Sequence, residues 1–204
     1  EIIDGYDAQA VPDGIVADRL DSAGYGLSLQ VDKDSINALE KKGTVLDTKT
    51  ALTKSNAYST ILDMYAKMTR AGVPTKGRWL IVAPETKALI LKDPEFIKQG
   101  DISQKLVEEG AFGMIGGFAC FESANMMYEN TEEVGSKKTT TELIAGHPLF
   151  ASRVMEFSVP VHLQDLAGSG NFIGASAVQG RLVYGVDVTK PEAVLVKRKE
   201  ENVG

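Results

Sequence analysis

Cysteine and histidine are scarce in this sequence, and their scarcity excludes several kinds of chemistry. One cysteine and two histidines occur among 204 residues. Cys120 cannot form an internal disulfide, and its apolar neighbours predict a small buried side chain in a reducing compartment; a reactive thiol is the alternative. His147 and His162 lack any nearby metal-ligand spacing of cysteine or carboxylate groups. We therefore predict structural or surface roles for both histidines.

Long apolar runs and an excess of positive charge are also missing. The longest apolar runs, such as residues 79–82, are far shorter than the ~20 residues of a membrane-spanning helix. No cationic leader precedes an apolar stretch, and the formal net charge is −6. We predict a non-secreted protein that binds neither membranes nor specific nucleic acid sequences. Because residue 1 is Glu rather than Met, we expect an upstream segment to be missing.

The first fifty residues have two helical patterns and then a break. Apolar residues recur at helical spacing over residues 12–29, which predicts a long amphipathic helix that tolerates two late glycines. A shorter helix is predicted from Asp32, as its N-cap, to a stop at Gly43. The threonine-rich residues 44–54 predict a linker, with a domain boundary near residue 50.

The next segment predicts a helix, a strand and a second helix in succession. Ser55 is expected to cap a helix that ends at residues 71–74. Residues 78–83 form an apolar run typical of a strand buried on both faces. Pro84 suits the first turn of a helix that should end before Asp93, itself a possible cap for a further turn.

The second half of the chain is rich in strand patterns. Residues 112–121 predict one strand with a bulge or tight bend at two adjacent glycines, and residues 129–141 predict an exposed loop. Helices are expected at residues 104–109 and 149–155. Strands are expected over residues 143–147, 157–163, 181–186 and 193–197. This mixture without strict alternation predicts an α+β protein.

No motif in this sequence predicts catalysis or cofactor binding. Residues 113–117 lack the glycine spacing of a dinucleotide site and the Lys-Ser/Thr of a phosphate loop. Residues 168–170 lack the setting of a nucleophile elbow. The acidic residues between 4 and 21 are spread around a helix, which favours a solvated or intersubunit face over a divalent-ion site. We predict no catalytic residue, no cofactor and no metal ion.

Four phrases of the sequence carry more information than its periodicity. They comprise residues 77–84 with 89–97, 115–118 with 122–126, 144–147 with 151–156, and 181–186 with 191–196. The first contains Gly-Arg-Trp-Leu-Ile-Val-Ala-Pro followed by Asp-Pro-Glu-Phe-Ile. In this order the phrases resemble the major capsid proteins of tailed bacteriophages and prophages, although a Gln that is usual in the third phrase is absent. The resemblance covers roughly residues 8–198.

The resemblance implies an α+β Hong Kong 97-type capsid fold with a long spine helix, a peripheral domain and an axial domain. Residues 12–29 would be the spine, within a peripheral-domain part at residues 1–50. Residues 51–155 would form the axial domain, and residues 156–204 would be closing strands shared between the two domains. The N-terminal arm and extended loop of the family are not matched in this sequence.

The resemblance also implies a structural subunit and not an enzyme. Copies of the protein would assemble into hexamers and pentamers of an icosahedral shell that encloses double-stranded DNA, with scaffolding and portal proteins as further partners. The location would be the virion capsid, and the host cytoplasm before assembly. One alternative is a bacterial nanocompartment shell protein. The other is a small α+β hydrolase or ligand-binding domain that uses acidic residues near residues 165–172, with His162 and Asp165 in one pocket.

In a shell subunit, contacts with other copies should lie on the acidic face of the first helix, on the 129–141 loop and at separate basic residues. The candidate intersubunit contacts are Asp13, Asp18, Arg19, Asp21, Arg70, Glu132, Lys137 and Arg153.

Overall fold

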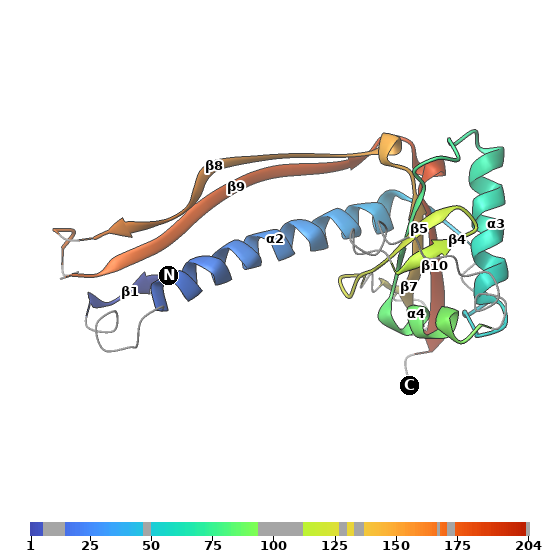
Figure 1. Cartoon of the computed structure of the whole chain (residues 1–204), viewed down its shortest axis with the longest axis horizontal. Helices are drawn as coiled ribbons and strands as arrows, with labels where there is room; N and C mark the ends of the chain where they lie inside the picture. Colours follow the sequence, from blue (N-terminus) through green and yellow to red (C-terminus); the bar gives the residue numbers. More distant parts are fainter. Residues whose placement is uncertain are drawn as a thin grey trace. The chain divides into compact units, whose positions relative to one another are not determined.

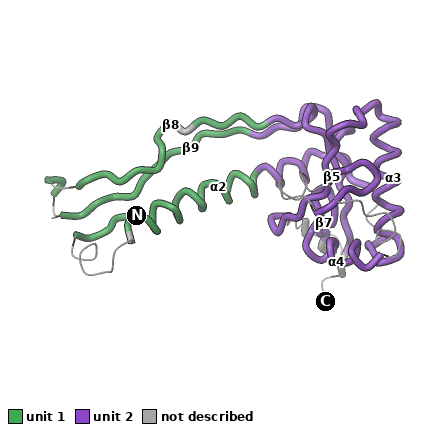
Figure 2. Tube along the Cα trace, viewed as in Figure 1, with its two compact units in different colours: residues 1–34, 153–185 green, residues 35–152, 186–204 purple. Residues whose placement is uncertain are grey.

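The computed structural model describes residues 1–5, 15–46, 50–93, 112–126, 130–132, 137–166, 168–170 and 174–202. The chain divides into two compact units (Figure 2). Unit 1 comprises residues 1–34 and 153–185, and unit 2 comprises residues 35–152 and 186–204. None of the helices in the described ranges is long and apolar enough to cross a membrane. The boundary near residue 50 and the peripheral and axial ranges remain predictions.

Unit 1 contains a three-stranded sheet and the N-terminal part of a long helix (Figure 1). The sheet has the order β1 (Ile2–Ile3), β9 (Ser176–Val188) and β8 (Ala151–Asp165), and the helix is α2 (Ile15–Lys42). β1 is antiparallel to β9, and the amine of Glu1 extends this pairing by donating to the carbonyl oxygen of Val178 at 3.1 Å. The buried apolar residues described in this unit are Ile3, Val31, Ala175 and Val178.

Helix α2 is continuous, so the prediction of two separate helices was wrong. Asp32 is an exposed residue inside the helix rather than an N-cap. The amide of Gln30 donates to Asp34 Oδ1 at 3.1 Å, one helical turn away, and such a pair stabilises a helix across the predicted break. The predicted stop is confirmed: the helix ends at Lys42, and the Gly43 amide donates to the Leu39 carbonyl at 2.9 Å. Residues 12–14, the predicted start, lie outside the described ranges.

Unit 2 is built on a seven-stranded mixed sheet. Its order is β2 (Thr44–Val45), β10 (Leu195–Asn202), β7 (Lys137–Gly146), β3 (Trp79–Val82), β5 (Phe118–Glu122) and β4 (Gly113–Ile115), with β6 (Asn130–Glu132) also paired to β7. β3 runs parallel to β5 and antiparallel to β7. β2 therefore lies inside the stretch predicted to be only a linker, and that prediction was wrong for Thr44 and Val45.

The central strands of this sheet are buried on both faces. Leu80 and Leu143 belong to a cluster with Ile61, Met64 and Met68 of helix α3 (Ala57–Arg70). Their neighbours Ile81 and Ile144 belong to a second cluster, which includes Ile36 and Leu39 of α2. Because successive strand residues point to opposite faces, α3 covers one face and the C-terminal part of α2 covers the other. The strand predicted at residues 78–83 and buried on both faces is confirmed.

The two ends of α3 have different hydrogen-bonding patterns. The N-cap is Asn56 rather than the predicted Ser55, and its side chain does not cap the helix but accepts a hydrogen bond from the Thr53 amide at 2.7 Å. At the C-terminus the Val73 amide donates to the Met68 carbonyl, and Gly72 adopts φ 74°. This pattern is a Schellman motif, so the predicted helix stop is confirmed.

Arg78 is the largest fully buried side chain of the described residues, and it holds the segment after α3 in place. Its guanidinium donates to the carbonyl oxygens of Val73 at 2.7 Å and Tyr65 at 3.1 Å, and to Thr69 Oγ1 at 3.0 Å. Its Nε donates to the Pro74 carbonyl at 2.8 Å. Burial lowers the pKa of Arg78, an effect that Tyr65 partly opposes. A cation at the carboxyl end of a helix is also favoured by the helix dipole.

Helix α4 (Pro84–Leu91) begins with its proline as predicted, since Pro is well suited to the first helical turn. The following strand prediction was only partly right. Residues 112–121 form two strands, β4 and β5, joined by a tight turn in which Gly116 has φ 53° and Gly117 has φ 88°. Two adjacent residues with positive φ are typical of a hairpin turn. The tight bend is confirmed and the single strand is wrong.

Two further predictions were wrong. The described parts of residues 129–141 are not a loop, because β6 and β7 pair there and β7 continues to Gly146. Residues 149–155 are not a helix: a single 3-10 turn, η1 (Pro148–Phe150), leads directly into β8. The strands at residues 143–147, 157–163 and 181–186 fall within or largely within β7, β8 and β9. The last predicted strand begins at Leu195, after the turn η2 (Pro191–Ala193). The helix predicted at residues 104–109 and the turn after Asp93 lie outside the described ranges.

Replacing Arg78 by Met should lower the free energy of unfolding by about 3 kcal/mol, because buried carbonyl oxygens lose a charged donor. Denaturant titration of the purified protein measures this change. Arg70→Met, at the exposed end of α3, is the matched control and should change stability by less than about 0.5 kcal/mol. Equal losses in the two variants would contradict the role given to Arg78.

Gly146 supplies a second test of the packing. A Cβ atom there would lie 2.4 Å from Cζ2 of Trp79, the single tryptophan of the sequence. Gly146→Ala should therefore destabilise the protein by about 1–3 kcal/mol and shift the tryptophan emission. Gly185→Ala is the control, since open space surrounds its Cβ position. Unchanged emission and stability in Gly146→Ala would show that this contact is not formed.

Candidate intersubunit surfaces

The predicted contact residues on α2 are exposed but differ in how they are used. Asp18 and Asp21 project from the helix into solvent, and neither forms an ion pair with any described residue. Arg19 lies 3.3 Å from the Glu1 carboxylate, with both side chains about half exposed. An exposed pair of this kind contributes little to stability, but it does occupy Arg19 within its own subunit. Asp13 lies outside the described residues.

The remaining predicted residues lie on three other elements. Arg70 is the last residue of α3 and Arg153 lies near the start of β8; both are exposed, and neither forms an ion pair among the described residues. Glu132 of β6 and Lys137 of β7 are direct cross-strand partners. These two are therefore neighbours although the sequence placed them at different points of a loop. Arg70, Glu132 and Lys137 belong to unit 2, and Asp18, Arg19, Asp21 and Arg153 belong to unit 1.

Sequence reasoning missed an apolar surface on the ribbon formed by β8 and β9. Val154 is 74% exposed, Val183 57% and Met155 48%. Tyr25 of α2, in the same unit, is 70% exposed. The β9 residues could have been found from their alternation, since Arg181 and Val183 are exposed while Leu182 and Tyr184 are partly buried. The β8 residues could not, because the helix predicted over residues 149–155 hid the period of two.

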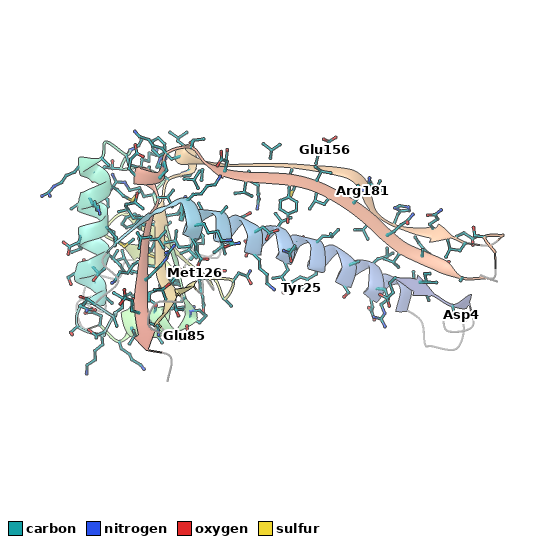
Figure 3. All side chains as sticks on the ribbon, turned by 180° about the vertical axis from the view of Figure 1, so that it is seen from behind. Asp4, Tyr25, Glu85, Met126, Glu156 and Arg181 are labelled. Carbon is teal, nitrogen blue, oxygen red and sulfur yellow. The ribbon has the colours of Figure 1, made fainter. Side chains whose placement is uncertain are left out.

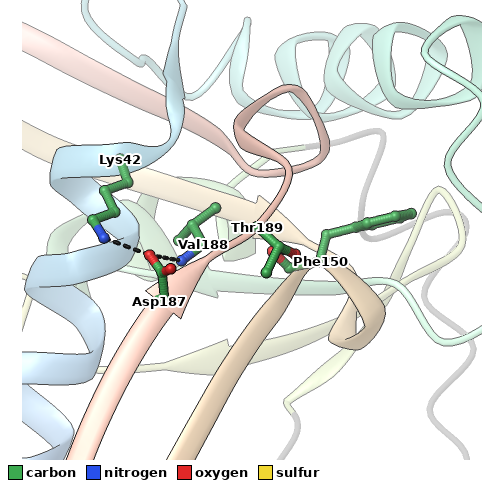
Figure 4. Close-up of polar contacts among 5 residues, drawn as sticks. All are labelled: Lys42, Phe150, Asp187, Val188 and Thr189. Atoms are coloured by element: carbon green, nitrogen blue, oxygen red, sulfur yellow. Dashed lines mark hydrogen bonds and ion pairs between the residues drawn. The ribbon is translucent and has the colours of Figure 1, made fainter.

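Two polar contacts join α2 to β9. In unit 1 the Tyr184 hydroxyl donates to Asp34, the carboxylate that also accepts from Gln30. This hydrogen bond, with smaller contributions from burial and from the Asp34 charge, raises the pKa of Tyr184. In unit 2 the ammonium of Lys42 pairs with Asp187, whose Oδ1 also accepts from the Val188 amide at 2.9 Å (Figure 4). The Lys42 hydrogen bond, followed by the Val188 amide, lowers the pKa of Asp187.

The residues considered for catalysis have structural partners. The Leu149 amide donates to His147 Nδ1 at 3.2 Å, so Nε2 carries the proton that it donates to the Lys76 carbonyl at 2.9 Å. Cys120 is buried, as predicted, and burial raises the pKa of its thiol to about 12, which disfavours the reactive thiolate. His162 is hydrogen-bonded to the Pro160 carbonyl and to the side chain of Gln179.

A cavity of about 540 Å³ lies in unit 2 beside the start of α4. Its lining includes apolar Leu52 and Met126 and buried Thr86 and Glu142. The hydrolase alternative required a common pocket for His162 and Asp165, and neither residue lines this cavity. Among the described residues, no group of three or more His, Cys, Asp or Glu side chains is arranged to hold a metal ion.

Comparison with known proteins identifies the class to which this arrangement belongs. The family model described as phage capsid protein matches residues 3–196. A structure of Mycobacterium phage Che8 has a TM-score of 0.72 and 21% identity, covering 97% of this chain and 68% of that one. The capsid structure of cyanophage P-SCSP1u has a TM-score of 0.76 and 12% identity, covering 100% of this chain and 71% of that one. A virus-like particle from Pyrococcus furiosus has a TM-score of 0.52 and 18% identity, covering 86% and 64%. A search of curated proteins finds no match.

The chain has the α+β fold of Hong Kong 97-type capsid structures, so the predicted fold is confirmed. The match to residues 3–196 goes further: the chain belongs to the phage capsid protein family. It is accordingly a structural, non-enzymatic component of the virion capsid. Self-association follows from the nature of a capsid.

The hydrogen bond between Tyr184 and Asp34 can be tested by titrating the tyrosine. Asp34→Asn should lower the pKa of Tyr184 toward the ordinary tyrosine value, because the carboxylate that accepts the phenol proton and disfavours the phenolate is lost. Ultraviolet absorbance titration measures the change, and Tyr184→Phe identifies the signal. Asp32→Asn, at another exposed carboxylate of α2, is the control. A Tyr184 pKa that is the same in Asp34→Asn and the unaltered protein would rule out the contact.

Proposed function

We propose that this protein assembles with copies of itself into hexamers and pentamers that close an icosahedral shell around double-stranded DNA. The observation that carries the proposal is the family match across residues 3–196, together with the likeness of the whole fold to phage capsid structures. The Pyrococcus particle covers less of this chain at a lower TM-score, so the phage shell is preferred to a nanocompartment.

The surface of the described residues suits assembly through many weak contacts. Asp18, Asp21, Arg70 and Arg153 are exposed charges without ion pairs in their own subunit, among the residues described. Each exposed charge pair contributes about 0–1 kcal/mol. Repetition of such contacts around closed rings makes the whole assembly much stronger than a single contact. We propose that these residues, with Arg19 and the Glu132–Lys137 pair, contact neighbouring subunits.

The acidic balance of the chain fits a wall around DNA. A net charge of −6 provides no general attraction for the phosphate backbone, so packaged DNA would not be held against the shell by the average charge of the subunit. Scaffolding and portal proteins are the proposed partners during assembly. Residues 1–50 and 51–155 remain our proposed peripheral and axial parts, joined by the closing strands after residue 155.

Negative-stain electron microscopy of the full-length protein, with light scattering, tests the proposal. We expect closed particles with icosahedral symmetry and ring-shaped capsomers as intermediates. Titration of disassembled subunits with duplex DNA at low and moderate salt should give no salt-sensitive binding. A protein that stays monomeric over a wide concentration range, with or without its assembly partners, would refute the proposed function.

A further inference from the structure

One face of β8 carries a row of exposed residues, among those whose side chains are described. Residues 153, 155, 159 and 163 share a face because strand side chains alternate with a period of two. Met155 is 48% exposed, Leu163 42% and Val159 38%, and Arg153 at the head of the row is also exposed. We call Arg153, Met155, Val159 and Leu163 the β8 strip. It is an apolar row that begins with a cation.

Helix α2, in the same unit, is hydrogen-bonded to the neighbouring strand β9 instead. Gly180 of β9 faces Val161 of β8, since a Cβ atom on Gly180 would lie 3.0 Å from the Val161 Cα. Even positions of β9 therefore share a face with odd positions of β8, which include the strip. On that face Tyr184 of β9 donates to Asp34 of α2. α2 is thus held against β9, and β8, the outer strand of the three-stranded sheet, keeps its strip exposed.

α2 has a complementary stripe on its own exposed side. Asp18, Asp21 and Tyr25 are spaced by three and four residues, so they lie one above another on the helix. Tyr25 is 70% exposed and is labelled in Figure 3. We call Asp18, Asp21 and Tyr25 the α2 stripe. Two like charges three residues apart on a helix repel, and the adjacent cation, Arg19, is paired with Glu1.

The strip and the stripe match in the order of their residues and in their charge. Each has charge at one end and apolar surface after it, with opposite signs of charge. From Asp21 to Tyr25 the helix rises ~6 Å, and from Arg153 to Met155 the strand advances ~7 Å. A cation placed beside Asp18 and Asp21 would therefore bring the Tyr25 ring against Met155.

We propose that the β8 strip of one subunit docks on the α2 stripe of a neighbouring copy, with Arg153 beside Asp18 and Asp21. The partner is a second copy because the family self-associates and because the two surfaces have complementary charge. The contact joins two different surfaces, so it propagates head to tail and closes into a ring where the rotation between neighbours allows. This inference rests on the proposed assembly function and assigns it a specific interface.

Charge reversal on each side of the contact provides the test. Full-length protein carrying Asp18→Lys and Asp21→Lys, or carrying Arg153→Glu, should show at least a tenfold higher critical concentration for shell assembly at low salt. Combining all three substitutions in one chain should return that concentration to within threefold of the unaltered protein, because every contact again joins opposite charges. Lys33→Glu, an exposed reversal on α2 outside the stripe, is the control and should stay within twofold. Circular dichroism and thermal unfolding should show the same fold in all variants.

A mixture of the two reversed variants gives a more selective result. In a ring, each subunit presents its stripe to one neighbour and its strip to the other, so contacts are all attractive only when the variants alternate. Alternation closes in a ring of six but not in a ring of five. Equimolar mixing should therefore restore hexamers without complete shells, as native mass spectrometry and microscopy would reveal.

The outcomes separate this interface from the proposed function. If the unaltered protein forms shells and the single reversals assemble equally well, the interface is wrong while the assembly function stands. Reversals that block assembly without recovery in the combined variant also overturn it, since the charges would then have other partners. Failure of the unaltered protein to assemble under any condition removes the proposed function itself.

Discussion

Burial of the central strands on both faces is the constraint on which unit 2 depends. Leu80 and Leu143 face α3, while Ile81 and Ile144 face the C-terminal part of α2. A sheet in this position cannot alternate apolar and polar residues, so β3 has the continuous apolar sequence Trp-Leu-Ile-Val. Both helices must then be held at fixed positions over the sheet, and the polar groups near their ends serve this need.

Arg78 illustrates how a polar group supports this core. Its guanidinium donates to the Tyr65 carbonyl of α3 and to the carbonyls of Val73 and Pro74, which lie beyond the helix and have no helical partner. The close approach of Trp79 to Gly146 has the same origin, because strands pressed between two helical layers leave no space for a side chain at that point.

Unit 1 differs from unit 2 in its balance of buried and exposed apolar residues. The apolar residues buried in its described part are few, while Tyr25, Val154 and Val183 remain largely exposed. A subunit that functions alone would rarely keep so much apolar surface in solvent. In a shell protein, burial between copies can offset this cost, and we propose that this exposed surface contributes to the contacts between subunits. Within this unit the hydrogen bond from Tyr184 to Asp34 joins β9 to α2.

The sequence alone determined the features that depend on neighbouring residues. The stop of α2 at Gly43, the turn of residues 71–74, the buried strand β3 and the proline that starts α4 all follow from local conformational preference, and all are confirmed. Four ordered phrases also determined the family. The charged candidates Asp18, Asp21 and Arg153 were chosen from sequence only as charged residues, and their exposure was seen in the structure.

Only the tertiary structure decided the features that depend on distant partners. Asp32 is a residue type typical of a helix N-cap, yet it lies inside one continuous helix. The apolar residues that follow it in this helix, Ile36 and Leu39, are packed against the sheet. Residues 151–155 have helix-compatible composition, yet they begin β8, and β9 pairs beside it. Local preference is weak where a long-range partner supplies hydrogen bonds and burial. The β8 strip could not be seen from sequence for the same reason, since a surface is defined by what the fold leaves uncovered.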